Sequence, residues 1–187
     1  MGLDLMDRAL ENQLPKGVVL ADTAYGNDSD FRLGIRQRGL KYGVGIQGST
    51  KVVRVDSLGR QRGKPISVAK LARRVPRREY RRITWREGTK GTLFSHFAFW
   101  RVVPFQELTK TENPESVWLI IEWPPGESEP SDFYLFSESR SVSKKKMVQT
   151  IKERWRTERA YEDLKGELGL DHFEGRRYRG WHHHVTV

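Results

Sequence analysis

The sequence predicts an α/β fold that contains a long β-rich block. Residues 1–47 alternate helical and strand patterns in the order helix–strand–helix–strand, which is typical of an α/β layer with parallel strands. Residues 48–142 then carry β-branched and aromatic runs separated by turn-rich segments. A helical pattern returns only at about residue 143. We therefore expect three segments: an α/β part (1–47), a β-rich insertion (48–142) and a helical C-terminal part (143–187).

The α/β part begins with an amphipathic helix over residues 3–14. Leu and Met recur there near helical spacing, and Pro15 and Gly17 end the pattern. The stretch VVLAD, residues 18–22, predicts a short buried strand.

A second helix is expected to run to about Arg38. Asn27 or Ser29 can cap its start, and Gly39 closes it. The stretch KYGVGIQ, residues 41–47, predicts a second strand parallel to the first. Two such strands alone would leave exposed sheet edges, which is unfavourable for a free-standing domain.

The β-rich block contains one short helix and three clear strands. SVAKLARRV, residues 67–75, predicts one or two helical turns before a proline. Strong β patterns then occupy residues 92–105, 116–125 and 131–138, between turn-rich segments.

Charge and composition indicate the partner. The chain carries 34 Lys and Arg against 24 Asp and Glu, a net charge of +10, which favours a polyanion partner and above all nucleic acid. A merely soluble basic domain is the alternative.

Cysteine is absent, so disulfides and thiolate metal sites are excluded. No apolar run approaches the roughly 20 residues of a membrane span, and no signal peptide pattern opens the chain. We expect a cytoplasmic protein with no membrane partner.

The final helical pattern places charges on its apolar stripe. On a continuous helix, Arg154 and Lys165 lie within about 40° of Glu158, on the stripe that Met147 and Ile151 would bury. A charge there is costly unless it is paired or meets an ion or a phosphate. The alternative is an Arg154–Glu158 ion pair that only stabilises the helix.

A second acid stands where α/β sheets place functional groups. In VVLADTAYG, Asp22 follows the expected strand and precedes a tight turn. Asp is also a common helix cap and turn former, so a purely structural role remains an alternative.

These two stretches make the chain resemble the C-terminal part of the catalytic domain of bacterial insertion-sequence DDE transposases. VLADTAYG resembles the motif around the second Asp of that family. A late helix in one branch carries the signature Tyr-x2-Arg-x3-Glu-x6-Lys, which Arg154, Glu158 and Lys165 match; Ile151 stands at the Tyr position. The tail GLDHFEGRRYRGWHHH is also similar to one subgroup. The resemblance implies a partial RNase H-like fold with a β-rich insertion before the last catalytic helix.

The resemblance also implies chemistry and partners. Asp22 and Glu158 would be catalytic carboxylates that hold Mg²⁺ in a two-metal site, and Arg154 and Lys165 would contact DNA phosphates. The partners would be transposon-end and target DNA, with a second copy of the chain or a full-length transposase as a protein partner.

An arginine-rich segment begins the insertion. Arg77, Arg78, Arg81 and Arg82 are expected to track the DNA backbone, with a solvated face as the alternative. Trp85 could stack on an extruded base, although core packing is the more usual role of such a residue. The triplet at residues 182–184 supports neither a zinc site nor a tag, because three consecutive His cannot share one face.

The family's first Asp has no clear counterpart here. Asp4 and Asp7 are the only candidates for it before VVLAD, and both fall on the polar side of the first helix. We therefore expect a fragment that does not cleave DNA alone. The alternative function is a non-catalytic DNA-binding remnant that interferes with a full-length transposase.

Overall fold

A computed structural model describes residues 2–88 and 91–166 of the chain. The tail that resembles one transposase subgroup, including the histidine triplet, lies outside the described residues. The chain divides into two compact units, Met1–Ile151 and Lys152–Val187, which we treat separately. No helix in the described part is both long and apolar enough to span a bilayer.

The described elements alternate helices and strands before a strand-rich middle. The helices are α1 (Gly2–Glu11), α2 (Thr23–Gly26), α3 (Ser29–Gln37), α4 (Val68–Ala72), the 3₁₀ turn η1 (Arg77–Glu79), α5 (Phe105–Leu108), α6 (Lys144–Lys152) and α7 (Trp155–Gly166). The strands are β1 (Val18–Ala21), β2 (Lys41–Ile46), β3 (Lys51–Val55), β4 (Gln61–Ser67), β5 (Arg81–Gly88), β6 (Gly91–Pro104), β7 (Val117–Trp123) and β8 (Asp132–Phe136).

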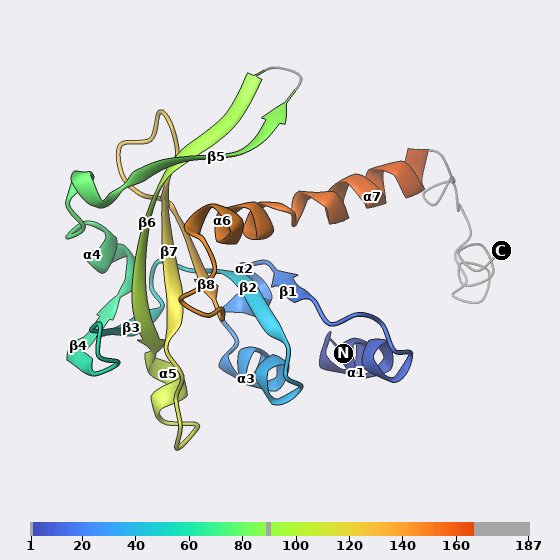
Figure 1. Cartoon of the computed structure of the whole chain (residues 1–187), viewed down its shortest axis with the longest axis horizontal. Helices are drawn as coiled ribbons and strands as arrows, with labels where there is room; N and C mark the ends of the chain where they lie inside the picture. The colour runs from blue at the N-terminus through green and yellow to red at the C-terminus, as the bar shows by residue number, and fades with distance from the viewer. Residues whose placement is uncertain (1, 89–90, 167–187) are drawn as a thin grey trace, which may run out of the picture. The chain divides into compact units, whose positions relative to one another are not determined.

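The strands form a single mixed sheet in the order β1-β2-β8-β7-β6-β3-β4, with β5 paired to β6 (Figure 1). The expected parallel pairing of the first two strands is confirmed, in the register Val18↔Lys41 to Ala21↔Val44. The expectation that this pair has two exposed edges is wrong. Strand β8 runs antiparallel along β2 and covers its second edge, so that only β1 remains an edge strand of the pair.

The three strands expected in the middle of the chain are confirmed as β6, β7 and β8. They lie in the same sheet as β1 and β2, because β8 pairs with β2 on one side and with β7 on the other. The short helix expected within residues 67–75 is also present, as α4.

Two apolar clusters pack on the sheet. Residues of α3 and α4, among them Ile35 and Leu71, pack with residues of β2, β6, β7 and β8 in the larger cluster. The smaller cluster joins Met147, Val148 and Ile151 of α6 to Phe97 and Phe136 of the sheet. Alternate residues of one strand contribute to different clusters, as the period of two in a β-strand requires.

Helix α3 is capped by a residue other than those expected. Asp28 accepts hydrogen bonds from the backbone N–H groups of Asp30 (2.8 Å) and Phe31 (3.4 Å), so the assignment of the cap to Asn27 or Ser29 is wrong. Gly39 ends the helix as expected, in the left-handed region with φ +67°.

The late helical pattern is interrupted, so the expectation of one continuous helix is wrong. Helix α6 ends at Lys152 and α7 begins at Trp155. At the junction, Arg156 N–H donates to Glu153 O and Thr157 N–H donates to Arg154 O. At the junction these i→i+3 hydrogen bonds replace the i→i+4 bonds of an α-helix. A single helical wheel therefore does not relate Met147 to Glu158.

Candidate functional site

Asp22 lies directly after β1 and forms the N-cap of α2. Its Oδ1 accepts hydrogen bonds from the backbone N–H groups of Ala24 (3.0 Å) and Tyr25 (3.3 Å). The side chain is exposed, and within the described residues its Oδ2 accepts no hydrogen bond. Asp22 therefore does cap a helix, as the structural alternative predicted, but the cap uses only one of its two carboxylate oxygens. The other oxygen is free to bind a ligand.

Helix α2 contacts β2 backbone to backbone. A Cβ at Gly26 would lie 1.8 Å from the carbonyl oxygen of Gly45, and a Cβ at Gly45 would lie 3.0 Å from the Oγ1 of Thr23. Side chains at these two positions would push the helix off the strand. The glycines of TAYG and GVGIQ therefore place Asp22 close to the neighbouring parallel strand.

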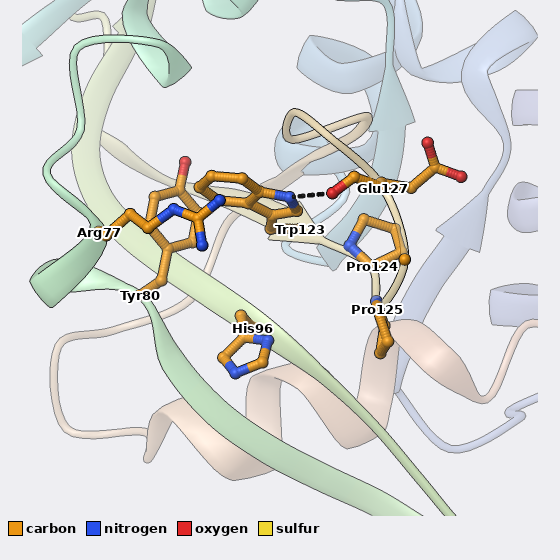
Figure 2. Close-up of a pocket in the computed structure, with 8 residues that line it drawn as sticks. Arg77, Tyr80, His96, Trp123, Pro124, Pro125 and Glu127 are labelled. Atoms are coloured by element: carbon orange, nitrogen blue, oxygen red, sulfur yellow. Dashed lines mark hydrogen bonds between the residues drawn. The ribbon is translucent and has the colours of Figure 1, made fainter.

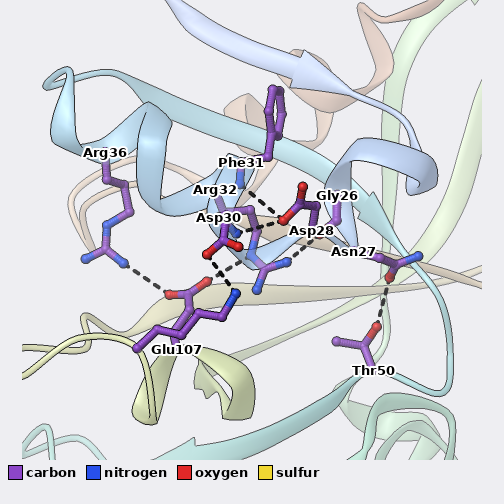
Figure 3. Close-up of polar contacts among 10 residues, drawn as sticks. Gly26, Asn27, Asp28, Asp30, Phe31, Arg32, Arg36, Thr50 and Glu107 are labelled. Atoms are coloured by element: carbon purple, nitrogen blue, oxygen red, sulfur yellow. Dashed lines mark hydrogen bonds and ion pairs between the residues drawn. The ribbon is translucent and has the colours of Figure 1, made fainter. Parts of the chain in front are cut away.

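A fully buried ion pair contacts the end of the same turn (Figure 3). The Arg32 guanidinium donates through Nη1 to the carbonyl oxygen of Gly26 (2.6 Å) and through Nε to Oε1 of Glu107 (2.8 Å). Both side chains are 0% exposed. Arg36 adds a second contact to Glu107, at 3.3 Å. Gly26, the last residue of α2, is thereby connected to Arg32 of α3 and to Glu107 of α5. Arg32 and Glu107 lie 75 residues apart in the sequence.

The same cluster affects a buried tyrosine. Burial, followed by the negative charge of Glu107, raises the pKa of the Tyr42 hydroxyl above its ordinary value. Tyr42 lies on β2, and its backbone N–H donates a hydrogen bond of 2.8 Å to the Oγ of Ser137, the residue after β8. Tyr42 is fully buried within the larger apolar cluster.

Asn27 holds the end of the turn. Its Oδ1 accepts hydrogen bonds from the Gln47 backbone N–H (2.9 Å) and from the Thr50 hydroxyl (3.0 Å; Figure 3). The turn between α2 and α3 is therefore attached to the residues that follow β2. Together with the glycine contact and the buried ion pair, this gives the Asp22 turn (residues 22–28) three independent anchors.

Glu158 belongs to the second unit, in the first turn of α7. Its Oε1 forms an ion pair with Nη1 of Arg154 at 2.9 Å, and both side chains are about half exposed. This is the i,i+4 contact given above as the alternative to a functional role. Lys165 lies in the last turn of the same helix. No residue of α7 is buried.

The four arginines expected to contact DNA differ in their surroundings. Arg77 stacks on the ring of Trp123 at 4.1 Å and Arg82 stacks on Phe94 at 4.0 Å. Arg78 and Arg81 are exposed, and the positive charge of Arg81 adds to burial in lowering the pKa of Lys144. Two of the four guanidinium groups thus already have an aromatic partner.

Trp85 is half-buried on β5. Its ring packs edge-to-face on Phe97 with the ring centroids 5.9 Å apart, and it belongs to the smaller apolar cluster. This contact supports the core-packing alternative for Trp85 over base stacking.

The Arg77–Trp123 stack forms part of a pocket of about 350 Å³ that the sequence pattern did not indicate (Figure 2). Tyr80 and His96 line it, and Tyr80 packs edge-to-face on Trp123 at 5.3 Å. The indole N–H of Trp123 donates to the Glu127 carbonyl oxygen at 2.9 Å. Its residues come from η1, β6 and β7 and the loop after β7, so no local motif joins them.

Within the described residues, no group of three or more acidic, His or Cys side chains is arranged to hold a metal ion. Asp22 and Glu158 are the two carboxylates that the family resemblance assigns to metal, and they belong to different units.

Comparison with known families concerns the first half of the chain. Residues 1–92 match the model of the DDE superfamily endonucleases. This part of the chain belongs to the DDE superfamily. The matched residues include the Asp22 turn and the arginine-rich segment. No curated protein gives a significant match to the chain.

The family assignment agrees with the architecture. A mixed α/β structure with an eight-stranded sheet is consistent with an RNase H-like DDE fold. Membership of this superfamily indicates a nuclease or transposase-type function with DNA as the substrate. Enzymes of the superfamily usually use divalent metal ions.

Proposed function

We propose that the chain belongs to a DDE-type DNA transposase and takes part in metal-dependent strand cleavage and transfer during transposition of an insertion sequence. The observation that carries the proposal is the position of Asp22 within the DDE match: an exposed carboxylate, with one free oxygen, at the carboxyl end of a strand. Open α/β sheets place their functional groups at such strand ends.

The chemistry of the carboxylates fits Mg²⁺, which prefers oxygen ligands and is commonly held by one or two carboxylates. In this proposal Asp22 and Glu158 hold the metal. When bound, Mg²⁺ would help to activate the attacking oxygen and stabilise the leaving oxygen. Arg154 and Lys165 bind DNA phosphates near the cut, since both lie on the same short stretch of chain as Glu158.

Metal binding tests this assignment without requiring activity. Mn²⁺ broadens the NMR signals of nearby amides, so titration should selectively broaden those of Thr23, Ala24 and Tyr25, and those around Glu158. Asp22→Asn and Glu158→Gln should each weaken the effect at both places. Asp28→Asn is the matched control, because Asp28 also caps a helix through Oδ1 but is not assigned to metal.

Broadening near Asp22 that is unaffected by Glu158→Gln would show that the two carboxylates do not share a metal site. Absence of selective broadening at either place would contradict the whole metal assignment.

The second candidate is a DNA-binding protein without catalysis, which acts by occupying the DNA or the partner of a full-length transposase. The excess of ten positive charges and the exposed arginines favour it. It predicts duplex binding that persists in Asp22→Asn and Glu158→Gln without any selective metal effect. Loss of transposition by a full-length relative on co-expression would support it.

A further inference from the structure

A basic groove lies between α4 and the β3–β4 hairpin, on the first unit. It has a volume of about 730 Å³, and Trp100 of β6 also lines it. Six cationic side chains share the lining: Lys51, Arg54, Arg62, Lys64, Lys70 and Arg74. All six are exposed, and among the described residues that line the groove none is acidic. Such a concentration of one sign of charge in a concave surface attracts a polyanion.

Most of these cations have no partner within the described part of the chain. Lys51, Lys64, Lys70 and Arg74 make no side-chain hydrogen bond or ion pair there. Arg62 is an exception, since its guanidinium contacts Asp56 at 2.9 Å. In the arginine-rich segment, Arg77 and Arg82 stack on aromatic rings, whereas Arg78 and Arg81 are exposed. The unpartnered side-chain donors of the groove are therefore available to phosphate oxygens.

The sheet register places like charges of the groove opposite one another, which lowers the stability of the strand pair. Arg54 on β3 faces Arg62 on β4 directly. Like charges at opposed positions of an antiparallel pair destabilise it. Lys70 of α4 and Arg74, two residues beyond the end of that helix, bring two further like charges into the lining. A counter-ion with several negative charges along its length would relieve both repulsions.

The aromatic residue of the groove favours a phosphate backbone over unpaired bases. The Arg54 guanidinium lies 3.8 Å from the centre of the Trp100 ring and covers one of its faces. The indole N–H already donates to Glu79 at 2.9 Å. Proteins that bind single strands rely on open aromatic faces on which bases stack. No such open platform is provided by the one aromatic side chain in the described lining.

We propose that this groove binds the sugar–phosphate backbone of duplex DNA, as a contact additional to the arginine-rich segment. The proposal rests on the proposed function only in taking DNA as the partner. It does not require Asp22 or Glu158 to bind metal.

The test compares two variants that each lose three charges. The groove variant carries Lys51→Gln, Lys64→Gln and Lys70→Gln. The control variant carries Arg8→Gln, Lys16→Gln and Lys41→Gln, at exposed positions outside the groove. Binding of a fluorescent duplex is measured by anisotropy over a range of salt concentrations, after circular dichroism has shown that both variants are folded.

Each lost phosphate contact should reduce the slope of log K against log salt by about 0.9. The groove variant should therefore lose about 3 in slope, with its affinity converging on that of the parent at high salt, whereas the control should lose less than about 1. Equal losses in the two variants would overturn the groove assignment. A loss seen only with a single-stranded oligonucleotide would also overturn it.

The outcomes separate the two proposals. Duplex binding that depends on the groove, without metal binding at Asp22, would leave the groove standing and remove the catalytic assignment. Failure of the parent chain to bind duplex at all would remove the groove and the DNA partner together.

Discussion

The two carboxylates assigned to metal are held in opposite ways. Asp22 stands on a turn fixed by a close backbone contact, a buried ion pair and the Asn27 hydrogen bonds. Glu158 stands on a helix that buries no residue, with one half-exposed ion pair to Arg154. Contacts from distant parts of the chain define the first position, whereas the interaction that the described residues make with Glu158 is local. The Asp22 turn is therefore preorganised.

The largest expected effect on this comparison comes from the buried ion pair. Arg32→Met leaves the Glu107 carboxylate buried without its main partner, which should lower the free energy of unfolding by about 3–5 kcal/mol. Urea denaturation measures the change. The double variant Arg32→Met with Glu107→Met should lose clearly less than the sum of the two single variants, because it leaves no uncompensated buried charge. Additive losses would show that the two residues are not coupled.

Gly26→Ala should have the next largest effect. Its Cβ would fall 1.8 Å from the Gly45 carbonyl oxygen, so that α2 must move off β2, at a cost of about 3 kcal/mol. Gly17→Ala is the matched control, since a Cβ there meets nothing within 4 Å and should leave thermal and urea denaturation almost unchanged. A Gly26 variant as stable as the parent would mean that the turn is not held by this contact.

Substitution of Asp22 separates its cap from its charge. Asp22→Ala should cost about 1 kcal/mol through loss of the bonds to the N–H groups of Ala24 and Tyr25. Asp22→Asn keeps an equivalent cap and should have nearly parental stability while losing the carboxylate. If Asp22→Asn is as unstable as Asp22→Ala in the same denaturation experiment, the charge contributes to stability and the separation fails.

The smallest effect is expected at Glu158. Glu158→Ala removes one exposed i,i+4 pair and should change helix content and stability by no more than about 0.5 kcal/mol. Asp163→Ala, which removes the Arg159–Asp163 pair at 3.0 Å in the same helix, provides a matched comparison. A loss above about 2 kcal/mol at Glu158 alone would show that this carboxylate is anchored by more than Arg154, and would remove the contrast with Asp22.

Much of the local structure followed from the sequence alone. Apolar periodicity and the glycine and proline positions located β1, β2, α3 and the three long strands of the middle block, because these signals act between neighbours in the chain. The Asp22 motif was visible for the same reason: an acid after an apolar run, followed by a turn, is a local pattern. The charge of +10 likewise depends on composition only.

The tertiary structure decided what those elements are joined to. The pairing of β8 with β2 and the Arg32–Glu107 ion pair connect segments that are 75 or more residues apart, and nothing in either segment alone identifies its partner. Arg32 lies between Asp30 and Arg36 in a short charged helix, and only packing shows that it is buried. The break between α6 and α7 is a local feature, but residues 147–165 carry no Pro or Gly to mark it. The sequence thus determined the elements and the Asp22 motif, whereas burial, which depends on contacts between distant residues, decided how that motif is held.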